Sequence, residues 1–270
     1  MASRLFFITL LALAPAALNA APAPASAQAR TSGEARVLEK TTQPLYPVRQ
    51  IGDQLQVQQL APGLWLHRTE RTFANGSRFT SNGLVLDNGD GIWLLDTAWG
   101  YYPTQDLLHW IDVVLQKPVV KAIATHSHDD RTGGYLALAE RGIRLEVTAQ
   151  TAQLAAKERI EPLQVAAELA VGQHYQAGPV DWFYPGPGHT HDNTTLYLPR
   201  YQLLFGGCFV KAPRYPGLGN IADADVAAWP ASLQRLKAAY PDARIVVPGH
   251  GDVGDLALLD YSLGLLQPAR

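Results

Sequence analysis

The segment 125–131, with the sequence THSHDDR, concentrates side chains that bind metal ions. Imidazole nitrogens and carboxylate oxygens are ligands that Zn²⁺ accepts. If the backbone stays extended beyond the preceding apolar run, His126, His128 and Asp130 point to the same side, because side chains alternate along a strand. The segment therefore predicts a metal site. The alternative interpretation is that the aspartates cap a following helix and the histidines are exposed.

Three more candidate ligands stand in turns beside other predicted strands. His189 lies in the sequence PGPGHT, Cys208 follows two glycines, and His250 lies in VVPGHG. Each alone is weak evidence, since an isolated histidine or a buried cysteine is more often structural. Because all these segments occupy equivalent places at strand ends, where α/β proteins bind ligands, they favour one shared metal centre.

Together these segments offer more ligands than one tetrahedral zinc ion accepts, and the number suits two ions that share a water or hydroxide. The set is His126, His128, Asp130, His189, Cys208 and His250. His191, two residues after His189, is a competing candidate. The remaining histidines are expected to be structural or exposed; they are His67, His109 and His174.

The elements that position these ligands are predicted from apolar periodicity and from turn signals such as Asn75-Gly76 and Asn82-Gly83. In the first half, strands are expected at 55–60, 64–69, 84–87, 92–96 and 119–125, and helices at 103–115 and 133–140. In the second half, we expect a strand at 145–148, a helix at 149–159, a strand-rich region at 164–209, a helix at 230–240, a strand at 244–247 and a helix at 256–266. This repeated order suggests two α/β halves packed into one domain. Segment 70–81 is either an ordinary hairpin or a mobile flap.

Composition and charge narrow the class of protein. The chain has 270 residues, 47% hydrophobic and 17% charged, which suits one large globular domain or two small ones and excludes a disordered chain. The 22 basic and 24 acidic residues give a net charge of −2, so we expect no nucleic-acid partner. Cys208 is the single cysteine, which excludes an internal disulfide.

The beginning of the chain has the pattern of a secretory signal peptide. Arg4 is followed by an apolar run at 5–13 and by an Ala- and Pro-rich stretch with the cleavage-like sequence AQA at 27–29. Cleavage after Ala20 is a weaker option. A membrane anchor is disfavoured, because the run is well short of the roughly 20 residues that a span needs. We expect an exported, periplasmic, soluble protein with a cleaved signal at 1–29, an N-terminal lead-in at 30–49 and one domain at 50–270.

The candidate ligands resemble the metallo-β-lactamase superfamily, whose signature is H-x-H-x-D with distant histidines, across residues 50–266. More narrowly, the chain resembles the class B β-lactamases of subclass B1. His126 is retained where the mono-zinc subclass has asparagine. Arg131 follows Asp130 where glyoxalase-type hydrolases and the remaining β-lactamase subclass carry a ligating histidine, and Cys208 is present where those relatives use other residues. Further similar segments are DTAW at 96–99, GPGHT at 186–190, GNIADA at 219–224 and PGHG at 248–251.

This resemblance implies an α/β (α+β) fold, a four-layer αββα sandwich with two Zn²⁺ ions per chain in a groove at one edge of its two sheets. The implied ligands are His126, His128 and His189 for the first zinc, and Asp130, Cys208 and His250 for the second. Arg131 is expected to support these ligands rather than to bind metal, because it points away from Asp130 if the backbone is extended.

The resemblance also implies an activity: zinc-dependent hydrolysis of the amide bond of penicillins, cephalosporins and carbapenems by a metal-bound hydroxide, which confers antibiotic resistance. Asp130 is expected to orient the hydroxide, and Asn220 to act near the lactam carbonyl. Lys211 is expected to pair with the substrate carboxylate. The alternative for Lys211 is a solvated surface charge, and the alternative for Asn220 is a residue that only shapes a turn.

The groove walls follow from the same resemblance. Segment 70–81 would be the flap over the groove, with Phe73 and Phe79 providing apolar contacts, and Trp99 would line the wall. Two other function classes remain open. One is another di-zinc hydrolase of this fold that acts on a thioester, lactone or phosphoester, and the other is a non-catalytic zinc-binding protein. We expect a monomer.

Overall fold

The computed structural model describes residues 46–267, all of which lie in one compact unit. The predicted signal peptide at 1–29 and most of the predicted lead-in at 30–49 lie outside the described residues. Within residues 46–267, no helix has the length and apolar character needed to cross a membrane.

An eight-stranded sheet forms from the first part of the described chain, and its strands lie side by side in chain order. They are β1 (Arg49–Ile51), β2 (Leu55–Ala61), β3 (Leu64–Thr72), β4 (Arg78–Asp87), β5 (Ile92–Leu95), β6 (Val119–Ile123), β7 (Leu145–Thr148) and β8 (Gln164–Ala167). Strands β1 to β5 pair antiparallel, whereas β5 to β8 pair parallel. The change follows from the connections, because short turns join antiparallel strands and parallel strands need a longer crossover.

A five-stranded sheet forms from the rest of the described chain, in the order β13-β12-β11-β10-β9. Its strands are β9 (His174–Ala177), β10 (Val180–Phe183), β11 (Thr195–Leu198), β12 (Leu203–Gly207) and β13 (Ile245–Pro248). Strands β9 to β12 are antiparallel, and β13 joins β12 in parallel. This sheet therefore repeats the change from antiparallel to parallel pairing seen in the first sheet.

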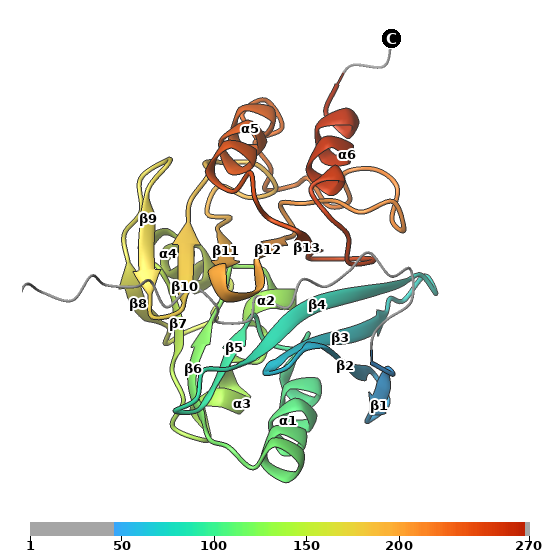
Figure 1. The fold of residues 1–270 in the computed structure, drawn as a ribbon, viewed down its shortest axis with the longest axis vertical. Helices are drawn as coiled ribbons and strands as arrows, with labels where there is room; N and C mark the ends of the chain where they lie inside the picture. Colours follow the sequence, from blue (N-terminus) through green and yellow to red (C-terminus); the bar gives the residue numbers. More distant parts are fainter. Residues whose placement is uncertain (1–45, 268–270) are drawn as a thin grey trace, which may run out of the picture. The chain divides into compact units, whose positions relative to one another are not determined.

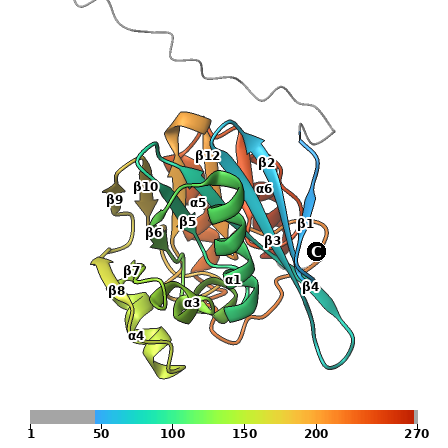
Figure 2. The same cartoon turned by 90° about the horizontal axis from the view of Figure 1, so that it is seen from below.

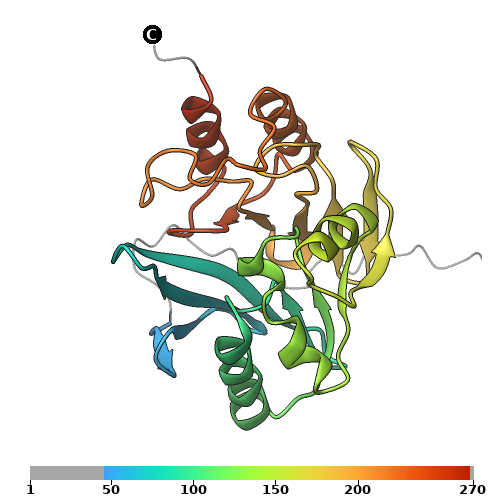
Figure 3. The same ribbon diagram turned by 180° about the vertical axis from the view of Figure 1, so that it is seen from behind.

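Helices cover the outer faces of both sheets and give four layers (Figure 1). The first sheet carries α1 (Tyr101–Trp110), a π-helical turn at Ile111–Leu115 and α3 (Tyr135–Ala139), which Figure 2 shows from below. The second sheet carries α5 (Trp229–Ala239) and α6 (Ala257–Leu265), again visible in Figure 3. The connections also contain α2 (Asp129–Thr132), α4 (Ala149–Lys157) and a 3₁₀ turn at Pro199–Tyr201.

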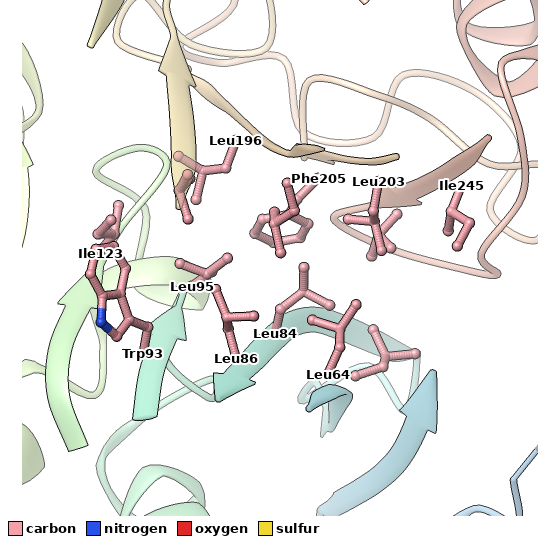
Figure 4. Close-up of a cluster of buried hydrophobic side chains, with 14 of the residues drawn as sticks. Leu64, Leu84, Leu86, Trp93, Leu95, Ile123, Leu196, Leu203, Phe205 and Ile245 are labelled. Carbon is pink, nitrogen blue, oxygen red and sulfur yellow. The ribbon is translucent and has the colours of Figure 1, made fainter. Parts of the chain in front are cut away.

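The central core lies between the two sheets (Figure 4). On β4, Leu84 and Leu86 point toward the other sheet, whereas Val85 packs under the outer helices, because side chains alternate along a strand. From β12, Leu203 and Phe205 meet them, and all five side chains are buried. The packing holds the two sheets face to face and therefore brings their strand ends to a common edge.

These layers confirm the fold class that the resemblance implies, the four-layer αββα sandwich. Locally, segment 70–81 forms the closed end of the hairpin of β3 and β4. Glu70 pairs with Thr80 and Thr72 with Arg78, so the ladder of β3 and β4 continues to a turn at 73–77.

The expectation that the third strand begins at Leu84 is wrong, because Asn82-Gly83 lies inside the ladder instead of forming a turn. Gly83 is needed there for space, since a Cβ at this position would lie 2.2 Å from Nε2 of His67 on the neighbouring strand. The backbone N–H of Asn82 donates a hydrogen bond of 2.8 Å to the Gly249 carbonyl, which follows a strand of the other sheet. The dipeptide thus serves two purposes: Gly83 makes room for His67 within the sheet, and Asn82 makes a hydrogen bond to the other sheet.

Candidate metal centre

The predicted metal ligands come together where strands of both sheets end. Strand β6 ends at Ile123, the chain bends through residues 124–128, and helix α2 begins at Asp129. The assumption of an extended backbone to residue 130 is therefore wrong: Asp130 reaches the centre from the first turn of a helix. Cys208 follows directly after β12, and His250 follows β13. The parallel pairing of β12 and β13 places these two ends side by side.

Three histidine rings form one half of the centre. The ring centroids of His126 and His128 are 4.8 Å apart, and each lies 5.1 Å from that of His189. His126 and His189 are buried, and burial lowers the pKa of both rings well below its usual value. Both rings are therefore neutral near pH 7, which is the form of histidine that binds metal.

Two nitrogens of these rings are left without partners. Nε2 of His126 and Nδ1 of His189 are buried and find no hydrogen-bond partner among the described residues. An unpaired buried polar atom is costly, and native proteins usually satisfy such atoms. A metal ion bound between the rings would satisfy a lone pair of this kind.

A compact triangle of three different ligand types forms the other half. The Cys208 sulfur lies 3.3 Å from Oδ2 of Asp130 and 3.1 Å from Nε2 of His250, and the last two atoms are 3.2 Å apart. Burial would lower the pKa of His250, but Cys208 and Asp130 raise it to about 10. Burial would raise the pKa of Asp130, but Arg131 and His250 hold it well below its usual value. The carboxylate of Asp130 is therefore ionised, and the surroundings of His250 favour a positive charge at its position, as a cation site requires.

The two halves are not separate clusters, because His126 and Asp130 face both. The groups whose ligand atoms lie within 4.8 Å of one another are His126–His189–Cys208, His126–His128–Asp130 and Asp130–Cys208–His250. The third group is the set expected for the second zinc. The three histidines expected for the first zinc are mutual neighbours by ring distance, and each belongs to at least one of the overlapping groups. The donor set of imidazoles, one thiol and one carboxylate fits zinc.

Two of the imidazoles are oriented by hydrogen bonds to the ring nitrogen that faces away from the metal centre. Nδ1 of His250 donates to the Thr80 carbonyl at 2.7 Å, so Nε2 is the nitrogen that faces the triangle. A metal ion bound there would replace the proton that the raised pKa keeps on this ring. Nε2 of His128 lies 3.0 Å from Oδ2 of Asp223, which leaves Nδ1 as the free nitrogen of that ring. The sequence analysis did not assign Asp223 a role, although it lies in the GNIADA segment that resembles the family.

Arg131 supports the ligands Asp130 and Cys208 from inside the fold. The guanidinium is wholly buried, and its Nη2 lies 2.9 Å from the Cys208 sulfur and 2.8 Å from Oδ2 of Asp130. The supporting role expected for Arg131 thus has the right partners, but the reason differs from the one expected. Arg131 lies in helix α2 and turns toward the centre of the protein instead of away from Asp130 along a strand.

Asp96 fixes the beginning of the ligand segment. Its carboxylate accepts hydrogen bonds from the Thr125 backbone at 2.7 Å and the Thr125 hydroxyl at 2.9 Å, and it pairs with Arg131 at 3.2 Å. Burial raises the pKa of Asp96 to about 6, although Arg131 and Thr125 oppose this rise. Asp96 also has a positive φ of 63°, a conformation that aspartate tolerates better than most residues. Thr125, next to His126, is therefore held rigidly.

The centre opens into a groove of about 1000 Å³. The residues predicted for its walls and substrate contacts all line it: Phe73, Phe79, Trp99, Lys211 and Asn220. Phe73 and Phe79 come from the β3–β4 hairpin, with ring centroids 5.8 Å apart, and Trp99 lies 5.7 Å from Phe73. One wall of the groove is therefore aromatic and follows the hairpin.

Lys211 and Asn220 differ in how firmly the fold holds them. Lys211 is only 9% exposed, so the alternative of a solvated surface charge is excluded. Its ammonium lies 5.1 Å from the ring centre of Trp229, and burial lowers its pKa. Asn220 is exposed, and its side-chain oxygen accepts a hydrogen bond from the Ala222 amide at 3.1 Å. Asn220 thus shapes a turn as well as facing the groove.

The other histidines lie apart from the ligand groups found in residues 46–267. His191 is exposed and belongs to none of those groups. His67 is buried in β3, where its Nε2 lies 3.2 Å from the Asp96 carbonyl. His109 is exposed on α1, and His174 is exposed in β9.

Comparisons with known proteins agree with this architecture. A family model described as the metallo-beta-lactamase superfamily matches residues 76–250. The chain is 43% identical over 217 residues to a protein named metallo-beta-lactamase type 2 from Bacillus sp. (strain 170), across 79% of this chain and 82% of that protein. It is 32% identical to the protein of the same name from Bacteroides fragilis, across 78% and 85% of the two chains. The solved structure of a metallo-beta-lactamase from Pontibacter korlensis, 39% identical, superposes with a TM-score of 0.74 across 80% of this chain and 100% of that one. This chain therefore belongs to the metallo-β-lactamase superfamily.

Proposed function

We propose that this chain is a β-lactamase of subclass B1 that hydrolyses the amide bond of penicillins, cephalosporins and carbapenems with two zinc ions. The observation that carries the proposal is the triangle of Asp130, Cys208 and His250 beside three histidine rings, at the base of one groove. Arg131 at the position after Asp130 supports the subclass, because it supplies a cation where other relatives are expected to carry a metal ligand. The names of the similar proteins support the substrate class.

His126, His128 and His189 would hold the first zinc, and Asp130, Cys208 and His250 the second. When bound, zinc supplies Lewis acidity and a water-derived nucleophile that ionises near neutral pH. The protein side chains hold the ligand atoms in place before the reaction, because Thr80 and Asp223 orient two imidazoles. Asp130 is also a proton acceptor at the base of the groove, in its ionised form.

Lys211 and Asn220 would bind and orient the substrate. A β-lactam carries a carboxylate close to the ring, and the Lys211 ammonium faces the groove without an ion-pair partner among the described residues. The carboxylate would offset the unfavourable burial of that ammonium, since buried charges need partners. The Asn220 amide N–H₂ could donate to the lactam carbonyl, because its oxygen is already used in the turn. Fixing both ends of the ring sets the angle of attack.

A chelator experiment tests the activity and separates the other function classes. The purified protein should hydrolyse a chromogenic cephalosporin, lose this activity on treatment with a chelator and regain it on addition of Zn²⁺. A zinc-loaded protein that leaves cephalosporins intact but cleaves a thioester, lactone or phosphoester would show a different hydrolase of this fold. A zinc-loaded protein that cleaves none of these substrates would be a metal-binding protein without this catalysis.

The substitution Cys208→Ala tests the second zinc. It should lower the zinc content from two ions to one per chain and reduce hydrolysis by more than about a hundredfold, because even the loss of a residue that only supports a ligand costs about 10–100-fold. Metal analysis and steady-state kinetics measure the two effects, and circular dichroism checks that the variant folds. His191→Ala is the matched control, and its zinc content should equal that of the wild type. Full turnover of Cys208→Ala with one zinc would contradict the assignment.

The substitution Lys211→Ala tests the carboxylate contact. The KM for a cephalosporin should rise about tenfold to a hundredfold with a smaller change in kcat, since a hydrogen bond to a charged group is worth roughly 1.5–3 kcal/mol. Lys237→Ala, which removes an exposed lysine of α5, controls for the loss of one positive charge. An unchanged KM for Lys211→Ala would exclude Lys211 from substrate binding.

We also propose that residues 1–29 are a cleaved signal peptide, that residues 50–270 form a single domain, and that the mature protein is a periplasmic monomer. The basis is the pattern of Arg4, the apolar run at 5–13 and the AQA sequence at 27–29. Mass spectrometry of the protein from a periplasmic extract should give the mass of a chain that begins at Arg30, and its sedimentation should correspond to one copy. Retention of residues 1–29 would contradict cleavage, and a dimer would contradict the monomer.

A further inference from the structure

Arg71, on β3, connects the hairpin to the segment of the metal ligands, and the proposed reaction gives it no role. Its Nη1 donates a hydrogen bond of 2.6 Å to Oδ2 of Asp129. Asp129 stands between two of the candidate ligands, His128 and Asp130. The hydrogen bond from Arg71 to Asp129 therefore links the hairpin at the edge of the groove to the segment that carries the metal ligands.

The same guanidinium lies against the aromatic wall of the groove. Its central carbon is 5.2 Å from the ring centre of Trp99 and 5.7 Å from that of Phe73. The two rings are in turn in edge-to-face contact, with centroids 5.7 Å apart. Arginine suits this position because its planar guanidinium can stack on aromatic rings while its N–H groups bind a carboxylate.

Among residues 46–267, few contacts besides these hold the hairpin beside the groove. They are aromatic contacts and a hydrogen bond of 3.1 Å from the Thr80 amide to the Tyr215 hydroxyl at the base of the hairpin. Its backbone hydrogen bonds are internal: the Phe73 amide donates to the Ser77 carbonyl, and the Gly76 amide donates to the Phe73 carbonyl. Phe73 is 40% exposed, so burial alone does little to fix its place. The position of the turn relative to the metal centre depends on the interactions at its base.

We propose that Arg71 is a positioning residue that holds the β3–β4 hairpin over the groove through Asp129, Trp99 and Phe73, and that it thereby raises the affinity for substrates with an apolar acyl side chain. The hairpin position is independent of the reaction, whereas the effect on substrate affinity rests on the proposed β-lactamase function. Arg71 does not touch the reacting atoms and acts through the aromatic wall.

The contact is suited to open and close. The side chains of Arg71 and Asp129 are 46% and 56% exposed, so water and salt screen their attraction. An exposed ion pair and a cation–π contact each shift an equilibrium only severalfold. Loss of Arg71 should therefore shift the hairpin position severalfold rather than abolish it.

Hydrogen exchange of the backbone tests the hairpin position without any substrate. In Arg71→Gln, the peptide 70–80 should exchange about threefold to tenfold faster than in the wild type. Arg78→Gln is the matched control, because it removes the same charge from the same hairpin, where Arg78 pairs with Glu70 at 3.2 Å and both side chains are exposed. This control and the β2 peptide 55–61 in both variants should exchange at the rate of the wild type. Equal exchange in Arg71→Gln and the wild type, or equal acceleration in Arg78→Gln, would overturn the proposal.

Kinetics with two penicillins test the effect on affinity. For a penicillin with a benzyl side chain, Arg71→Gln should raise KM about threefold to tenfold with kcat unchanged, whereas for the penicillin nucleus without an acyl group KM should stay the same. Arg71→Lys should recover part of the affinity, because it keeps the charge but loses the planar stacking group. Equal effects on both substrates would overturn the specificity role. If the wild type hydrolyses neither penicillin, the proposed function fails, and the exchange experiment still decides the role of Arg71 in holding the hairpin.

Discussion

The buried guanidinium of Arg131 is the interaction on which the candidate metal centre depends. It joins segments that are far apart in the chain, and its partners are Asn82, Asp96, Asp130, Cys208 and Gly249. A wholly buried cation is stable only when its surroundings supply negative charge and hydrogen-bond acceptors. The same carboxylate and sulfur that stabilise Arg131 would also carry the negative charge of a zinc site. The contacts that stabilise the buried Arg131 in the folded core therefore also hold the candidate zinc ligands in place.

The two-sheet core determines where this network can form. Apolar side chains that alternate along β4 and β12 hold the sheets face to face, and Phe205 fills the space between them. Because the sheets are fixed in this way, the end of β6 on one sheet meets the ends of β12 and β13 on the other. A hydrogen bond from the backbone N–H of Asn82 to the Gly249 carbonyl connects the two sheets directly. The groove lies along this edge, with the β3–β4 hairpin forming its aromatic wall.

Several features of the site followed from residue types and spacing. The segment 125–131 and the turns around His189, Cys208 and His250 pointed to one metal centre, and the structure brings these side chains within contact of one another. The fold class followed from the resemblance and is confirmed. The local geometry was harder to predict. The backbone after β6 bends into helix α2, and this bend lets Asp130 and Arg131 both reach the buried network, which depends on residues remote in sequence. Likewise, Asn82-Gly83 had the signal of a turn, but Gly83 is required where His67 approaches.

The sequence by itself determined which atoms are available for chemistry: imidazoles, one thiol and carboxylates, with one lysine and one asparagine placed after them along the chain. These are properties of residue type and spacing, which the chain carries before it folds. Only the tertiary structure decided which ring nitrogens face the metal centre, because Thr80 and Asp223 are remote in sequence from the imidazoles that they orient. It also decided that Lys211 is buried beside Trp229 and that Arg71 reaches Asp129, since both contacts depend on how separate elements pack. Burial and long-range hydrogen bonds arise from packing in three dimensions, and no local pattern of residues contains them.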